Sequence, residues 1–295
     1  MKRIIIAQWV TLGLHLAAML FGLIGLLFVL PNAAFIESLS DLGLQIFALG
    51  MQGGGASYMI LGTIATCFYG WQTLGGKTTA LFFFPAVLLS LGCELLGTST
   101  GFPFGAYSYL SGLGYKIADL VPFTIPLSWF YMGFVSLLLA HTTLRQGTHW
   151  LQRLEAIALG AMMLTSWDFV LDPAMSQTRF PFWEWHQFGA FFGMPLQNFA
   201  GWMGTGVLFM TVSTLLWGKA QPPLLNQKQL LFPILMYSGN FLFSMLLSYG
   251  GGIYPPILLG ILLGIAPAVG LWLMAPREDV PTADALIDAR PLLKV

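Results

Sequence analysis

Three acidic residues stand inside or at the end of strongly apolar stretches of this 295-residue chain, where charge is rare. Asp168 and Asp172 lie four residues apart in one stretch, and Glu94 ends another. Placing a carboxylate within a bilayer costs about 2.5–3.5 kcal/mol on insertion scales, so such residues persist where they do chemistry, bind a ligand or join helices. These acids are therefore the first candidates for a functional site.

The spacing of the two aspartates places both carboxyl groups on one face of a helix, about one turn apart. Two acids that close in an apolar medium cannot both ionise easily, so we expect one to stay protonated at neutral pH beside an ionised partner. Such a pair suits general acid catalysis. A structural alternative stays open, in which Asp172 and Pro173 end the helix near the interface and Asp168 hydrogen-bonds a neighbouring helix.

The composition excludes a soluble domain with a wetted surface. Hydrophobic residues make up 57% of the chain and charged residues 8%, and the mean hydropathy is +0.77. Apolar runs such as residues 4–30 reach the roughly 20 residues that cross a bilayer as a helix, whereas barrel strands would alternate and be about half as long. The sequence therefore predicts an all-α, polytopic membrane protein. The first run lacks a small-residue cleavage site and is interpreted as a retained span.

Apolar runs between polar or Gly/Pro-rich breaks predict about eight spans. They are residues 4–30, 43–70, 79–97, 122–141, 154–172, 189–217, 230–249 and 254–275. Basic residues then collect on one side, namely Lys2, Arg3, Lys77, Arg145, Arg153, Lys219, Lys228 and Arg277, against Lys116 and Arg179 on the other. The positive-inside rule makes the first side cytoplasmic, with both termini. We expect one transmembrane domain over residues 1–276 and a polar, flexible tail over residues 277–295.

This topology gives the three acids a common depth in the membrane. The third and fifth spans both run outward and carry Glu94, Asp168 and Asp172 at their exit ends. The two longest loops between spans, residues 98–121 and 173–188, open on the same side and are rich in Gly, Pro and aromatic residues. We therefore expect an active site in the non-cytoplasmic half of the protein.

Aromatic and amide side chains stand near these acids in the sequence. Tyr107 and Tyr109 follow Glu94 in a loop where turn formers alternate with aromatics. This pattern indicates either a structured loop that lines a cavity or an interfacial aromatic belt. Asn198 begins the sixth span, where its amide can hold a water or an acid, or cap the helix.

Other polar or glycine positions carry weaker signals. The Gly53–Gly55 run lacks the strand-to-helix context of a phosphate loop and is interpreted as a site of close helix packing. His15 and Asn240 are isolated in the sequence and are assigned packing roles. No spacing typical of metal ligands emerges, so we expect no metal site.

Four sequence motifs together resemble one known family, the CruF-type carotenoid biosynthesis proteins, which are carotenoid 1,2-hydratases and bisanhydrobacterioruberin hydratases. The resemblance covers most of the chain. The motifs are Glu94 with residues 103–109, residues 121–126 with Trp129, Trp167-Asp168 with residues 171–173, and residues 192–202.

The resemblance implies a membrane enzyme that adds water to the terminal isopropylidene double bond of an acyclic carotenoid end group. The product is a tertiary alcohol, and no redox cofactor is needed. The implied partners are an acyclic or monocyclic carotenoid, water and the lipid bilayer, with other enzymes of the pathway as candidates. A nucleic-acid partner is not expected.

A hydration of this kind assigns roles to the candidate residues. Asp168 is the expected proton donor, and Asp172 or Glu94 tunes it or deprotonates the water. Aromatic rings can stabilise the cation, and Asn198 can hold the water. The residues expected to contact substrate or water are Tyr107, Tyr109, Trp129, Trp167, Asn198 and Trp202.

Two other classes of function stay open at this point. A non-catalytic carotenoid or lipid carrier, or a scaffold for other enzymes, would use the aromatic loops as a groove and would not need clustered acids. A proton-coupled transporter would use carboxylates as a relay, but it would need titratable groups toward the cytoplasmic side as well. The confinement of the acids to one half of the membrane favours the enzyme over the transporter.

Overall fold

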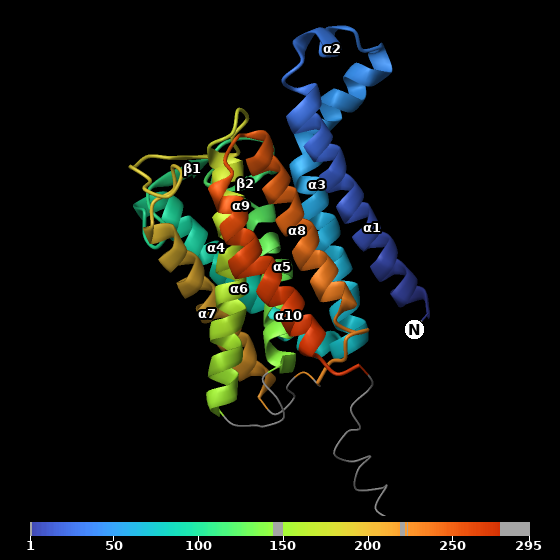
Figure 1. The fold of residues 1–295 in the computed structure, drawn as a ribbon, viewed down its shortest axis with the longest axis vertical. Coiled ribbons are helices and arrows are strands. Elements are labelled where there is room, and N and C mark those ends of the chain that lie inside the picture. Colours follow the sequence, from blue (N-terminus) through green and yellow to red (C-terminus); the bar gives the residue numbers. More distant parts are fainter. Residues whose placement is uncertain (1, 144–149, 219–221, 223, 278–295) are drawn as a thin grey trace, which may run out of the picture.

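The computed structural model describes residues 2–143, 150–218, 222 and 224–277 and is a bundle of long helices (Figure 1). The helices are α1 (Lys2–Ile24), η1 (Gly25–Val29), α2 (Ala33–Glu37), α3 (Asp41–Leu74), α4 (Gly76–Thr100), α5 (Thr124–Thr143), α6 (Trp150–Ser176), α7 (Gln197–Trp217), α8 (Leu231–Gly250), α9 (Pro255–Gly260), η2 (Ile261–Ile265) and α10 (Ala266–Met274). The strands are β1 (Tyr107–Tyr109), β2 (Lys116–Ile117), β3 (Val121–Pro122) and β4 (Trp183–Trp185).

The predicted class, an all-α polytopic membrane protein, is confirmed. Within the described residues, seven helical segments are long and apolar enough to cross a membrane. The expected span at residues 43–70 is the exception, although it forms the 34-residue helix α3. Its glutamines and glycines lower its hydropathy, and it packs along α1 at the edge of the bundle (Figure 1).

Two predicted boundaries differ from the structure in ways that bear on the acidic residues and Asn198. α7 begins at Gln197 and not at residue 189, because the preceding residues turn back on themselves with positive φ at Phe192 and Gly193. α6 runs through Pro173 to Ser176, so Asp172 does not end the helix. A proline removes one backbone hydrogen bond and crowds the carbonyl group four residues earlier, but neighbouring helices support the backbone around it. Residues 278–295 of the predicted tail lie outside the described residues.

The central helix of the bundle is α5, in which residues 128–140 are all buried. It contacts α3, α4, α6, α7 and α8. α4 and α6 end, and α7 begins, at the end of the bundle that holds β1 and β2, away from the N-terminus (Figure 1). Side chains from these three helices can therefore meet beneath the strands.

A buried hydrogen-bond network ties α1 to the rest of the bundle. The imidazole of His15 lies 2.7 Å from the Tyr58 carbonyl oxygen through Nδ1 and 3.1 Å from Asn240 Nδ2 through Nε2. Asn240 Oδ1 accepts from the Tyr131 hydroxyl at 3.4 Å. His15 and Asn240, which were each assigned a packing role from the sequence, therefore pack against each other, although 225 positions separate them.

The loop after α4 is anchored by Phe104, whose ring lies between two helical glycines. A Cβ added at Gly201 would lie 2.5 Å from the Phe104 ring, and one added at Gly97 would lie 2.7 Å from it. We expect Gly201→Ala to lower the free energy of unfolding by about 1–3 kcal/mol, because overfilling a packed core forces shifts. Gly204, on the same helix, has no such neighbour within 4 Å.

Chemical or thermal unfolding in detergent measures this difference. The matched variant Gly204→Ala is expected to be neutral or to stabilise the protein by up to about 1 kcal/mol, from helix propensity alone. Equal stabilities of the two variants would contradict the anchoring role of Phe104.

Candidate active site

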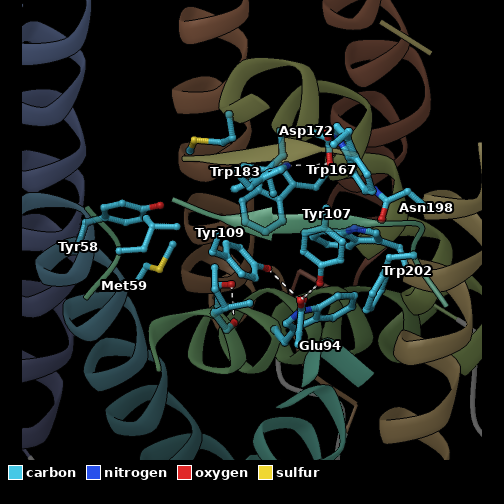
Figure 2. Close-up of a pocket in the computed structure, with 18 residues that line it drawn as sticks. Tyr58, Met59, Glu94, Tyr107, Tyr109, Trp167, Asp172, Trp183, Asn198 and Trp202 are labelled. Atoms are coloured by element: carbon cyan, nitrogen blue, oxygen red, sulfur yellow. Dashed lines mark hydrogen bonds between the residues drawn. The ribbon is translucent and has the colours of Figure 1, made fainter. Parts of the chain in front are cut away.

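A polar cavity of about 50 Å³ lies beneath β1 and β4, among the ends of α4, α5, α6 and α7 (Figure 2). A water molecule occupies roughly 30 Å³ in the liquid, so the cavity has room for a water or a small group. Eight residues predicted from the sequence line it: Glu94, Tyr107, Tyr109, Trp129, Trp167, Asp172, Asn198 and Trp202. The structure therefore brings together residues that are up to 108 positions apart (202 − 94).

Glu94, in α4, is buried and accepts hydrogen bonds on both carboxylate oxygens. Tyr107 and Tyr109 donate their hydroxyl protons to Oε2, the latter at 2.9 Å. Trp129, in α5, donates its indole N–H to Oε1 at 2.8 Å. Three donors around one buried carboxylate compensate for the water that it has lost.

Asp172, in α6, has even more donors. Trp185 Nε1 at 2.8 Å and Ser176 Oγ at 3.0 Å donate to Oδ1. Trp183 Nε1 at 3.2 Å and Asn198 Nδ2 at 3.4 Å donate to Oδ2. Figure 2 shows Asp172 and Glu94 at opposite ends of the group of lining residues, with the tyrosines between them.

Asp168 does not line the cavity, although it is fully buried one helical turn from Asp172. Asn198 Nδ2 donates to Asp168 Oδ2 at 2.8 Å and so joins the two aspartates. Asp168 Oδ1 has no hydrogen-bond partner among the described residues. Among the roles predicted for Asn198, the structure shows the one in which its amide holds acids. Its side chain makes no capping hydrogen bond at the start of α7.

The roof of the cavity is a two-stranded antiparallel sheet made from two loops. Tyr107 pairs with Trp185 and Tyr109 with Trp183, with Ser108 opposite Glu184. Because side chains alternate along a strand, the four aromatic residues share one face, and their O–H and N–H groups reach the acids. The loop of Tyr107 and Tyr109 therefore lines a cavity, as the first alternative predicted.

The structure adds two functional candidates to those predicted from the sequence, Trp183 and Trp185. Aromatic residues alternate with a polar residue both in Trp-Glu-Trp at residues 183–185 and in Tyr-Ser-Tyr at residues 107–109. This shared alternation is the sequence signal that could indicate pairing of the two segments. Burial, followed by the charge of Glu94, raises the pKa of Tyr107 and of Tyr109 well above its usual value. Both tyrosines therefore remain protonated hydrogen-bond donors.

Indole rings form the wall on the α5, α6 and α7 side. Trp129 and Trp202 have ring centroids 4.3 Å apart, and Trp167 meets Trp202 edge-on at 5.9 Å. Ring faces attract cations, by about 0.5–2 kcal/mol each when desolvated. Two carboxylates facing one aromatic cavity, with a third acid behind, can supply a proton, stabilise a cation and accept a proton.

Comparison with known proteins gives two matches. The profile of a family described as "Carotenoid biosynthesis protein" matches residues 54–267. A curated protein named bisanhydrobacterioruberin hydratase, from Haloarcula japonica, is 36% identical over 121 residues, which are 40% of this chain and 39% of that protein. The chain thus aligns with less than half of this relative. No solved structure matches.

Proposed function

Since this chain belongs to the family of carotenoid biosynthesis proteins, we propose that it is a hydratase for an acyclic carotenoid end group. The enzyme adds water across the terminal isopropylidene double bond and yields a tertiary alcohol. The observation that carries the proposal is a water-sized cavity with two carboxylates and a wall of indole rings, inside an apolar helix bundle. A polyene dissolves in lipid, so its end group must be met within the membrane.

The proton comes from the Asp168–Asp172 pair. The oxygen of Asp168 that lacks a partner favours the neutral acid there, whereas the donors around Asp172 favour its anion. Asp172 is the member that faces the cavity. Once Asp172 carries the proton of the pair, it gives that proton to the less substituted alkene carbon, where a C–H bond forms as the O–H bond and the π bond break. Asp168 acts as a positioning residue that keeps the pair singly protonated.

Water then captures the tertiary cation from the side of Glu94. A C–O bond forms, and Glu94 accepts the proton that the added water loses. Return of that proton to the aspartate pair through water in the cavity restores the enzyme. The net change is the addition of one water with no oxidation or reduction, so side chains and water suffice without an electron carrier.

The helix bundle stabilises the cationic end group better than bulk water would. The indole faces of Trp129, Trp167 and Trp202 stabilise the cation during its short lifetime. Hydrogen bonds from Tyr107 and Tyr109 hold the carboxylate of Glu94 in place. This preorganisation lowers the barrier because no dipole has to turn as charge develops.

The orientation of the site in the membrane follows from charge. Lys2, Lys77, Arg153 and Arg277 stand near helix ends at the end of the bundle opposite β1 and β4 (Figure 1). By the positive-inside rule that end is cytoplasmic, which leaves the active site in the non-cytoplasmic half.

Expression in a host that accumulates lycopene or a γ-carotene-like pigment tests the function. We expect a product heavier by one water, with its oxygen derived from labelled water, and no such product from the empty vector. Asp168→Asn is expected to reduce the yield at least about tenfold. Glu155→Gln is the matched control, since Glu155 is exposed on the same helix.

Two outcomes would count against this assignment. Full activity of a correctly inserted Asp168→Asn protein would remove Asp168 from the mechanism. Pigment that copurifies with the wild-type protein without any hydrated product would instead make the protein a carrier.

A further inference from the structure

A second and larger cavity, of about 480 Å³, lies between α1, η1, α3 and the loop after α6. Its lining is almost wholly apolar and includes Phe21, Phe47, Phe180, Phe182 and Phe243. The volume falls in the range of roughly 300–1,000 Å³ that is typical of small-molecule sites. The apolar cavity is therefore much larger than the polar cavity of about 50 Å³.

The two cavities share one lining residue. Tyr58 lines both of them. Two further segments contribute adjacent residues to the two cavities. Gly112 and Phe182 line the apolar cavity, and the residues that follow them, Leu113 and Trp183, line the polar cavity. A ligand that fills the apolar cavity would thus contact Tyr58, which also lines the cavity of Glu94 and Asp172.

Glycines on α3 make the room for this cavity. Gly43, Gly50 and Gly54 recur at the seven- and four-residue spacing of one helix face, and all three line it. A Cβ added at Gly54 would meet nothing within 4 Å. The predicted close helix packing of this glycine run is therefore wrong for Gly53 and Gly54. Only Gly55 has a close neighbour, the Gly112 carbonyl of a loop.

We propose that this apolar cavity, between the α1–α3 pair and the rest of the bundle, holds the polyene chain of the substrate. Its end group passes Tyr58 to reach Glu94 and Asp172. The inference rests on the proposed hydration and adds to it the path between helices by which a lipid-dissolved substrate enters. The ring of Tyr58, 5.5 Å from that of Phe243, is the side chain that must turn to admit the end group.

The cavity suits a long unsaturated hydrocarbon better than a polar lipid. Among its lining residues Arg179 is the only charged one, and its guanidinium lies 5.5 Å from the Phe180 ring centroid. Apart from Ser111 and the hydroxyl group of Tyr58, the remaining surface is made of aliphatic and aromatic side chains and glycine backbone. Such a surface suits a polyene chain, which has no group to hydrogen-bond.

Filling the cavity tests this assignment separately from catalysis. We would introduce Gly54→Leu into the Asp172→Asn protein, express it with the carotenoid, and measure polyene absorbance per mole of purified protein. Bound polyene is expected to fall about tenfold or more, because the added side chain takes the space of the ligand. Gly25→Leu fills the same cavity from η1, where a Cβ also meets nothing within 4 Å.

Gly53→Leu is the matched control, since Gly53 is the chain neighbour of Gly54, has equally open space and does not line the cavity. It should keep the bound polyene within about twofold. Size-exclusion chromatography checks folding, and if one filling variant does not fold, the other decides.

The outcomes separate the two proposals. Retained polyene in both filling variants, or loss of a copurifying phospholipid while polyene stays bound, would overturn the polyene site. Loss of polyene in the filling variants, together with a wild-type protein that hydrates nothing, would support the polyene site and reject the hydratase.

Discussion

Asp172→Asn is expected to lower the rate of hydration by about 10²–10⁴-fold, which is the usual contribution of a positioned acid. Asp172 is the aspartate that faces the cavity, and an amide cannot give a proton to an alkene. In heavy water the variant should therefore leave the carotenoid end group without deuterium. Mass spectrometry of the recovered carotenoid measures both the loss of hydration and the loss of deuterium uptake.

The same substitution also affects folding, so activity must be referred to folded protein. An asparagine turns its NH₂ group toward one of the indole N–H groups of Trp183 and Trp185, and an unpaired buried donor costs about 1–3 kcal/mol. Glu184→Gln changes an exposed carboxylate on β4 and should retain activity. Deuterium in the end group at the wild-type rate would show that Asp172 does not deliver the proton.

Glu94→Gln is expected to reduce alcohol formation by about 10²-fold or more while protonation continues. The cation would form at the Asp172 end and, with no base to activate water, would lose a proton and return to the alkene. In heavy water the recovered carotenoid should therefore gain deuterium without gaining water. This pattern is the reverse of that for Asp172→Asn, and it separates the acid from the base.

Loss of both reactions in Glu94→Gln would contradict these roles. It would mean that Glu94 is needed to form the cation, or only to hold the cavity together. Glu94→Asp distinguishes these two cases, because it keeps the charge but shortens the side chain. A purely structural role would lower stability in proportion to activity, which thermal unfolding in detergent would reveal.

Much of this site could be predicted from the sequence, because rare polar residues in an apolar chain have few reasons to be there. Glu94, Asp168 and Asp172 each carry that signal, and their predicted common depth follows from the order of the spans. Asn198 was found for the same reason, although its role was open. The fold class followed from hydropathy, which needs no knowledge of contacts.

The rest depended on contacts between distant segments. The pairing of β1 with β4 joins residues 76 positions apart, Ser108 and Glu184, and no local pattern specifies it. The sequence therefore does not assign Trp183 and Trp185 to the site. The position of Asp168 behind Asn198 depends on how α6 and α7 rotate, and the apolar cavity depends on where α3 packs. Neither property is encoded in periodicity alone.

The hydrogen bonds of the two acids also bear on how the protein is made. Glu94 takes its donors from Tyr107, Tyr109 and Trp129, all within 35 residues after it. The donors to Asp172 all lie within 26 residues after it.

The hydrogen-bond donors of each carboxylate therefore come from one helical hairpin, α4–α5 for Glu94 and α6–α7 for Asp172. Neither carboxylate needs donors from the other hairpin. Such a hairpin can leave the translocon with its acid already shielded, which offsets part of the cost of about 2.5–3.5 kcal/mol of inserting a bare one. We therefore expect the two hairpins to insert independently, with β1 and β4 pairing after both.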